Sequence, residues 1–160
     1  MKQKCPVCCM RVRLDSLSLV YLGVNFSFCS EQCMERFKGN PHLYIGIPGE
    51  KSIKQKGERV LKSRYFRIEQ SLSTEQVKIL SDAIDSMMGI HQVYIQGKDV
   101  HITYDLIEAT AAQIEQIIIN AGAKLGDGWT DKLKRALVHY TEDCETSNLE
   151  VSNKGHLNHH

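Results

Sequence analysis

Apolar and polar residues alternate with a period of two near the start of the chain, and this pattern then changes. Residues 17–28 alternate around Gly23 and contain Leu, Val, Tyr and Phe, which predicts a β-hairpin. A helix is expected directly afterwards, with Ser30 as its N-cap, Phe37 facing inward and Gly39 at its end. The first part of the chain is therefore predicted to fold as a hairpin followed by a short helix.

From residue 64 the pattern predicts a longer alternation of strands and helices. Two helices are each preceded by a capping box, Ser73 with Gln76 and Thr110 with Gln113, and Gly89 and Gly122 are their expected ends. Strands are expected at 65–68, 93–95 and 100–104, with a short closing strand at 123–125. The order βαββα, with this closing strand, is typical of a ferredoxin-like domain.

A further helix is predicted at 129–145, with Thr130 as N-cap. Its apolar stripe is expected either to cover the neighbouring domain, which is the commoner case, or to meet a partner; it consists of Leu133, Ala136, Leu137 and Tyr140. Residues 146–160 are polar and are expected to form a disordered tail. Three of the seven histidines lie in its last five positions, where they would bind metal ions weakly.

The overall prediction is an α+β protein with two folded domains. Residues 1–46 would form a small treble-clef-like zinc-binding domain, and 47–63 a basic linker. Residues 64–128 would form the ferredoxin-like domain, followed by the helix and the tail. Charge supports the division, because residues 1–64 carry twelve bases and five acids, whereas residues 65–160 carry eight bases and fourteen acids.

Composition places the chain among globular proteins, with 42% hydrophobic and 24% charged residues. No apolar stretch approaches the roughly 18 residues of a membrane span, and no apolar run follows the N-terminus as in a signal peptide. We therefore expect a cytoplasmic protein whose thiols stay reduced. The six cysteines then need a role other than disulfide formation.

Four of these cysteines have the spacing of a metal site. Cys5 and Cys8 form a C-x2-C pair, and Cys29 and Cys33 form a C-x3-C pair after an interval of twenty residues. A tight Cys-Pro-Val-Cys loop, a hairpin and two cysteines at a helix start are the layout of a treble-clef site. Four thiolates favour tetrahedral Zn²⁺, and their softness leaves Cu(I) as an alternative. Cys9 is either a spare ligand or a buried bystander, and Cys144 has no predicted role.

Residues 5–45 resemble the YHS/TRASH family, which is associated with heavy-metal binding, sensing and transport. The matching residues are Cys5-Pro6-Val7-Cys8-Cys9-Met10, Tyr21-Leu22-Gly23, Phe28-Cys29-Ser30-Glu31-Gln32-Cys33, Phe37 and Asn40-Pro41-His42-Leu43-Tyr44. The family usually has glycine where this chain has Cys9.

Residues 64–126 resemble the heavy-metal-associated (HMA) domain of copper chaperones and metal-transporting ATPases. The matching residues are Gly89-Ile90-His91-Gln92-Val93, Val100-His101-Ile102-Thr103-Tyr104-Asp105, Ile114-Glu115-Gln116-Ile117-Ile118 and Ala121-Gly122-Ala123. The two metal-binding cysteines of that family fall on Ser73 and Gln76, which do not hold Cu(I). The resemblance therefore implies a docking or supporting domain that binds no metal in the family's way.

Two functions remain open on the sequence. One is a heavy-metal-binding protein for trafficking, buffering or sensing, whose partner would be a metal-transporting ATPase or another HMA-domain protein. The other is a zinc-finger adaptor with a structural ion, binding a protein or a nucleic acid. The basic segment has little aromatic interleaving, so we do not expect nucleic-acid binding. No nucleophile–base pair, phosphate loop or paired carboxylate is recognisable, so we expect no enzyme and no catalytic residue.

Overall fold

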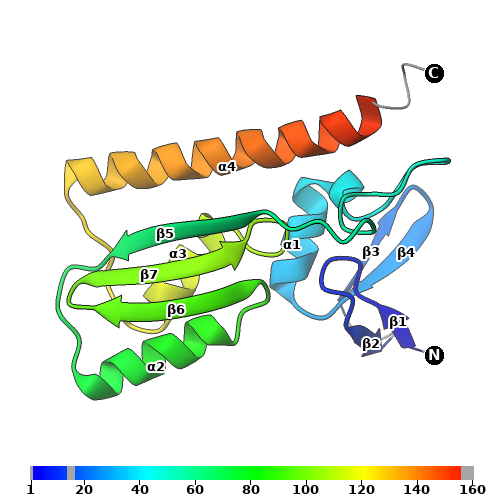
Figure 1. Cartoon of the computed structure of the whole chain (residues 1–160). Helices are drawn as coiled ribbons and strands as arrows, with labels where there is room; N and C mark the ends of the chain where they lie inside the picture. Colours follow the sequence, from blue (N-terminus) through cyan, green and yellow to red (C-terminus); the bar gives the residue numbers. More distant parts are fainter. Residues whose placement is uncertain (1, 14–16, 156–160) are drawn as a thin grey trace. The chain divides into compact units, whose positions relative to one another are not determined.

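The computed structural model describes residues 2–13 and 17–155 and has an α+β fold (Figure 1). The chain divides into two compact units, one of Met1–Arg59 with Cys144–His160 and one of Val60–Asp143. The predicted fold class is confirmed: the first unit contains the four clustered cysteines, the second contains a βαββ sheet region, and a long helix ends the described chain.

The first unit is built from short elements. They are β1 (Lys2–Lys4), β2 (Arg11–Arg13), β3 (Leu17–Tyr21), β4 (Val24–Phe28), α1 (Glu31–Gly39) and the 3₁₀ helix η1 (Pro41–Leu43). The predicted hairpin is β3–β4, paired antiparallel with Tyr21 opposite Val24. Its turn residues, Leu22 and Gly23, both have positive φ, as a two-residue turn requires in a right-twisted hairpin.

The core of the first unit surrounds Phe37, as the helical pattern predicted. The Phe37 ring is fully buried. Its centroid lies 4.9 Å from the ring centroid of Phe26, 5.3 Å from that of Phe28, 5.8 Å from that of Tyr21 and 6.2 Å from that of Tyr44. These rings come from β3, β4, α1 and the turn after η1. One aromatic cluster therefore holds the hairpin against the helix.

The segment expected to be a basic linker is structured instead. Ser52 and Ile53 are buried, and the Lys54 amide donates a hydrogen bond to the carbonyl of Leu43. Residues 47–59 belong to the first unit, and the next strand begins at Leu61, before the expected boundary at 64. The Lys and Arg side chains of this segment are exposed or half-buried, and they surround the two buried residues. The segment therefore lies at the edge of the core of the first unit, although its sequence shows little apolar periodicity.

The second unit has a three-stranded antiparallel sheet in the order β5–β7–β6. Its elements are β5 (Leu61–Arg67), α2 (Thr74–Asp85), β6 (Ile90–Gln96), β7 (Asp99–Asp105) and α3 (Ala111–Asn120). Inward-facing residues of the strands, including Ile102 and Phe66, pack against α2 and α3 through Ile84 and Ile114. This is the predicted βαββα order, with its core between the sheet and the helices.

Both predicted capping boxes are present. The Ser73 side chain accepts a hydrogen bond from the Gln76 amide, and the Gln76 side chain accepts one from the Ser73 amide. Thr110 and Gln113 do the same at the start of α3. The expected closing strand is reduced to one bridge between Ile68 and Leu125, so β5 remains an edge strand of the sheet.

The last helix, α4, runs from Trp129 to Gly155, ten residues beyond the predicted end. The prediction of a disordered tail from 146 is wrong for residues 146–155, while 156–160 lie outside the described residues. Within the first unit, Thr146 is buried and the Glu150 carboxylate accepts a hydrogen bond of 2.8 Å from the His42 amide. Polar side chains thus hold a segment whose composition predicted disorder.

Polar contacts also attach α4 within the second unit. Glu142 is only 2% exposed; it accepts hydrogen bonds from the Tyr104 hydroxyl, from Arg64 Nε at 3.2 Å and from the Ala111 amide at 2.7 Å. Burial first, and then the Glu142 carboxylate, raise the pKa of Tyr104, so its hydroxyl stays protonated and can donate. No helix in the described part of the chain has the length and apolarity needed to span a membrane.

We expect the Glu142→Ala substitution to lower the free energy of unfolding by about 2 kcal/mol, because it removes the buried acceptor of three hydrogen bonds. Urea unfolding followed by far-UV circular dichroism measures this change. Ser147→Ala, at an exposed position of the same helix, is the control and should change stability by less than about 0.5 kcal/mol. Equal effects of the two substitutions would contradict the role given to Glu142.

Candidate metal centre

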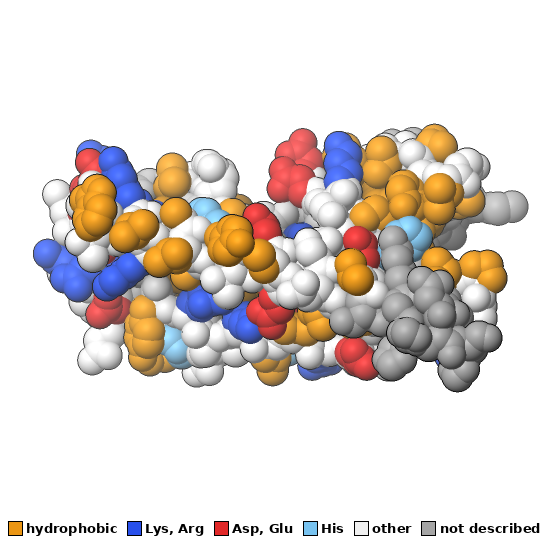
Figure 2. All heavy atoms as spheres, turned by 90° about the horizontal axis from the view of Figure 1, so that it is seen from above, with side chains coloured by type: hydrophobic (Ala, Val, Ile, Leu, Met, Phe, Trp, Pro, Cys, Tyr) orange, Lys and Arg blue, Asp and Glu red, His pale blue; other side chains and the backbone are white. Residues whose placement is uncertain are grey.

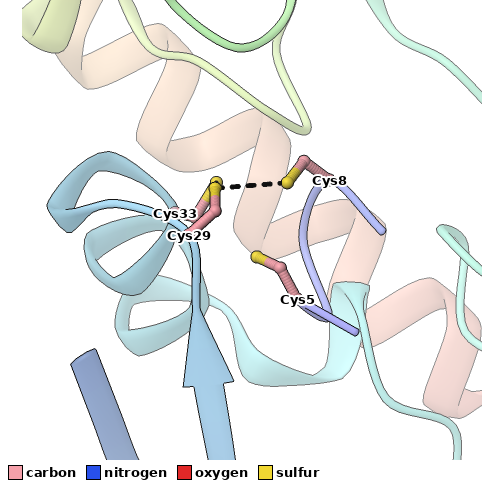
Figure 3. A group of neighbouring side chains, drawn as sticks. All are labelled: Cys5, Cys8, Cys29 and Cys33. Carbon is pink, nitrogen blue, oxygen red and sulfur yellow. Dashed lines mark hydrogen bonds between the residues drawn. The ribbon is translucent and has the colours of Figure 1, made fainter. Parts of the chain in front are cut away.

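Two chain segments bring the four predicted ligands together (Figure 3). Cys5 and Cys8 lie in the tight loop between β1 and β2, Cys29 follows β4, and Cys33 lies in the first turn of α1. The two cysteines of each pair are close in sequence, whereas the two pairs are brought together by the fold of the first unit.

The loop after β1 is closed by its own backbone. The Cys5 amide donates to the Met10 carbonyl and the Cys9 amide donates to the Cys5 carbonyl, both at 2.8 Å. This closure turns the Cys5 and Cys8 side chains toward the same point. It also places Cys9 at φ +67°, in the left-handed region where residues with a Cβ atom are strained.

The spacing of the sulfur atoms suits a tetrahedral ion. Cys8 Sγ lies 3.3 Å from Cys29 Sγ, and Cys29 Sγ lies 3.4 Å from Cys33 Sγ. All four sulfur atoms lie within 4.8 Å of one another, and all four cysteines are free thiols. A tetrahedral ion with metal–sulfur bonds of about 2.3 Å requires sulfur atoms about 3.8 Å apart. The four thiols can therefore hold one metal ion with only small adjustments.

The start of α1 supports two of the four side chains. Ser30 is the N-cap, as predicted, and its hydroxyl accepts a hydrogen bond from the Cys33 amide at 3.4 Å. The Cys29 thiol lies 3.6 Å from the same hydroxyl. The positive end of the helix dipole lies at this position, where it favours the negative charge of metal-bound thiolates.

The pKa values of Cys5, Cys8 and Cys33 are shifted in different directions. Hydrogen bonds from Cys33 and Cys8 lower the pKa of Cys5 well below its usual range. Hydrogen bonds to Cys5 and Cys8, together with burial, raise the pKa of Cys33. A hydrogen bond from Cys33 lowers the pKa of Cys8, but the bond to Cys5 and burial outweigh it and raise the value to about 12. Of these three cysteines, Cys5 therefore loses its proton most readily, whereas Cys8 and Cys33 hold theirs more firmly.

Burial divides the four ligands into two kinds. Cys5 and Cys33 are fully buried, whereas Cys8 and Cys29 are partly exposed. One edge of the cluster, formed by one cysteine from each pair, is thus open to solvent and to an incoming ligand.

The remaining cysteines lie outside the cluster. Cys9 is exposed rather than buried, and Cys144 is half-buried on α4. In the second unit, Ser73 and Gln76 are engaged in the capping box and offer no soft ligand. Among the described residues, the four cysteines form the one group with metal-ligand character.

The strained backbone at Cys9 is a feature of the site that the spacing of the cysteines did not reveal. The sequence gives one indication of this strain: Cys9 stands where the family that residues 5–45 resemble usually has glycine. A glycine would adopt φ +67° without strain, so cysteine here costs stability.

Comparisons with known proteins find similarity only among solved structures. No model of a protein family matches the sequence, and no curated protein matches it. A CsoZ metallochaperone is 28% identical over 42% of this chain and 99% of its own, with a TM-score of 0.40. A protein of Bacillus anthracis str. Ames, described as copper-ion-binding, is 18% identical over 43% of this chain and 100% of its own, with a TM-score of 0.41. At these scores neither likeness establishes the family or the function of the chain.

We expect metal affinity to fall steeply as the pH is lowered. Cys8 and Cys33 have raised pKa values and hold their protons at neutral pH, so binding must displace at least these two. Release of two protons raises the apparent dissociation constant about a hundredfold per pH unit of acidification. Competition with a chromophoric chelator at pH 8, 7 and 6, corrected for the protonation of the chelator, measures this slope. A pH-independent affinity would contradict it.

Replacing Cys9 by glycine should stabilise the first unit by about 1 kcal/mol, because it removes the strain at positive φ. Metal stoichiometry should stay unchanged, because Cys9 lies outside the cluster. Thermal unfolding and metal analysis of the same sample test both points. Gly23→Ala, at φ +78° in the hairpin turn, is the converse control and should be destabilising. A loss of metal on Cys9→Gly would show that Cys9 is a ligand.

Proposed function

We propose that this chain is a heavy-metal-binding protein that holds one ion in its four-cysteine centre and acts in metal trafficking, buffering or sensing. The observation that carries the proposal is the convergence of four free thiols within 4.8 Å. The resemblance of residues 5–45 to the YHS/TRASH family supports it. We place the protein in the cytoplasm, where thiols remain reduced.

Zn²⁺ is the ion that this donor set favours. Four thiolates in a tetrahedral arrangement form a closed site of the kind that binds zinc, and they leave no open position for a catalytic water. The same soft ligands also accept Cu(I), which remains the alternative ion. The closed donor set also supports a function in binding rather than catalysis.

The open edge of the cluster supports a site that can exchange its ion. A thiolate from a partner protein can approach Cys8 and Cys29, which are partly exposed, without displacing buried side chains. As a bond forms to the incoming thiolate, the bond to Cys8 or Cys29 is released. Cys5 and Cys33 are fully buried and would keep the ion until the transfer is complete.

For the second unit we propose a docking role. It has the βαββα order of the HMA domain that its sequence resembles, but Ser73 and Gln76 occupy the positions of the ligand pair. Domains of this kind pair with one another, so the proposed partner is a metal-transporting ATPase or another HMA-domain protein. The contact would bring the partner to this chain while the first unit supplies the ion.

A zinc-finger adaptor with a permanent ion is the second candidate function. The complete burial of Cys5 and Cys33 favours it, because buried ligands slow release of the ion. In that case the ion would serve only to hold the first unit together while its surface binds a protein.

Metal analysis of protein purified under reducing conditions should find one zinc or copper ion per chain. The double substitution Cys29→Ser with Cys33→Ser should lower this to below about 0.1 ion, because two remaining thiolates cannot close a tetrahedral site. Cys144→Ser is the matched control and should retain the full content, because Cys144 lies outside the cluster. Metal-free wild-type protein would contradict both candidate functions.

The rate of metal release separates trafficking from a structural role. With excess chelator, an exchangeable site should lose its ion within minutes, and Cys8→Ser should accelerate the loss because Cys8 lies at the open edge. Retention of the ion for many hours by the wild-type protein would instead establish the zinc-finger adaptor.

A further inference from the structure

The described chain has two features that the proposed function does not explain. The first is the apolar stripe of α4, and all of its members are exposed: Leu133, Ala136, Leu137 and Tyr140. Figure 2 views the molecule from the side on which α4 lies, and hydrophobic side chains line that face. The stripe does not cover the neighbouring domain, which was the commoner of its two expected roles. The second feature is the short distance between the two partly exposed thiols of the metal centre, and it has a chemical consequence.

These two thiols belong to different cysteine pairs. Cys8 Sγ lies 3.3 Å from Cys29 Sγ, and both side chains are partly exposed, whereas Cys5 and Cys33 are fully buried (Figure 3). A disulfide bond is about 2.05 Å long, so the two sulfur atoms would have to approach each other by only about 1.3 Å. The cysteines of the centre that an oxidant in solution can reach are thus also neighbours that can bond to each other.

The other cysteines near this edge fit such a bond less well. Cys33 Sγ lies 3.4 Å from Cys29 Sγ, but its side chain is fully buried, so an oxidant in solution does not meet it. Cys9 is exposed, but its sulfur atom lies outside the cluster. Exposure and distance together therefore select Cys8 and Cys29.

We propose that hydrogen peroxide oxidises Cys8 and Cys29 to a disulfide bond, and that this reaction releases the ion from the centre. The inference rests on the proposed function, because it requires an ion that the four cysteines hold. It adds a second condition for release. Besides contact with a partner thiolate, an oxidising environment makes the centre give up its ion.

The reaction consumes one peroxide molecule for each disulfide bond. The Cys8 thiolate attacks one peroxide oxygen, the O–O bond breaks and hydroxide leaves, so that Cys8 becomes a sulfenic acid. The Cys29 thiolate then attacks the Cys8 sulfur, the S–O bond breaks and a second hydroxide leaves. The two thiolates together lose two electrons, and the peroxide is reduced to two hydroxide ions that take protons from the solvent and become water.

The disulfide bond leaves too few ligands for the ion. The thiolate is the form of cysteine that binds metal, and a sulfur atom in a disulfide bond is no longer a thiolate. Only Cys5 and Cys33 of the cluster then remain as thiols, and two thiolates cannot close a tetrahedral site.

The same bond would replace the cross-link that the ion provides. It joins the loop after β1 to the junction of β4 and α1, and it closes a loop of twenty intervening residues. Closing such a loop restricts the unfolded chain and favours the folded state. The first unit should therefore stay folded after oxidative release, whereas removal of the ion by a chelator from the reduced protein leaves no cross-link.

Peroxide treatment of the zinc-loaded, full-length protein tests the release. About ten equivalents of hydrogen peroxide should lower the bound zinc from one ion per chain to nearly none, as two thiols per chain are lost. Ultrafiltration followed by metal analysis measures the bound zinc without a chelator, and an untreated sample is the baseline. The double variant Cys9→Ser with Cys144→Ser is the matched control, because both residues lie outside the cluster. It should release zinc like the wild type, and dithiothreitol with added zinc should restore both proteins.

Peptide mass spectrometry of the oxidised double variant, alkylated in denaturant without reduction, identifies the bond. Cys5 and Cys33 should be alkylated, and Cys8 should be joined to Cys29. A bond between any other two cysteines would overturn the assignment. The amide proton–nitrogen spectrum of the oxidised, zinc-free protein should keep the dispersed signals of residues 2–13 and 17–59, and their collapse would contradict the proposed cross-link.

The starting metal content separates this inference from the proposed function. A protein that holds zinc before treatment and keeps it in peroxide would overturn the oxidative release and leave the proposed function intact. A protein that holds no metal before treatment would overturn the proposed function and the oxidative release with it. Loss of release in the double variant would show that Cys9 or Cys144 carries the reaction, and would overturn the role given to Cys8 and Cys29.

Discussion

The convergence of four thiols on one point is the constraint on which the first unit depends. This cluster ties the loop after β1 to the junction of β4 and α1 through its side chains. Thiol hydrogen bonds are weak, whereas four metal–thiolate bonds contribute several kcal/mol or more to folding. The unit, Met1–Arg59 with Cys144–His160, has one aromatic cluster and therefore a small core, so metal binding and folding should be one event.

The second unit has a core that involves no cluster of candidate metal ligands among its described residues. Its core lies between a three-stranded sheet and two helices, and a capping box starts each helix. At α2 the box uses Ser73 and Gln76, the positions where the resembling family places its ligand pair. A hydroxyl and an amide that satisfy backbone groups stabilise the helix start but cannot bind soft ions. Among the described residues, the one cluster of candidate metal ligands therefore lies in the first unit.

Local patterns predicted the local structure well, but they did not predict contacts between distant segments. The hairpin, the Ser30 cap, both capping boxes and each of the two cysteine pairs follow from residues close in sequence. The course of α4 depends on Glu142 and Glu150, which accept hydrogen bonds from backbone amides far away in the chain. Hydrophobic periodicity does not record such contacts, so it did not predict how the polar side of this helix is held.

The most direct test of the central claim is the amide proton–nitrogen correlation spectrum of the metal-loaded protein, recorded before and after a strong chelator is added. If the cluster holds an ion on which the first unit depends, the signals of residues 2–13 and 17–59 should lose their dispersion on chelation. Signals of residues 60–143 should stay in place, because that unit has its own core. A spectrum in which both units remain unchanged after all metal is removed would contradict the claim.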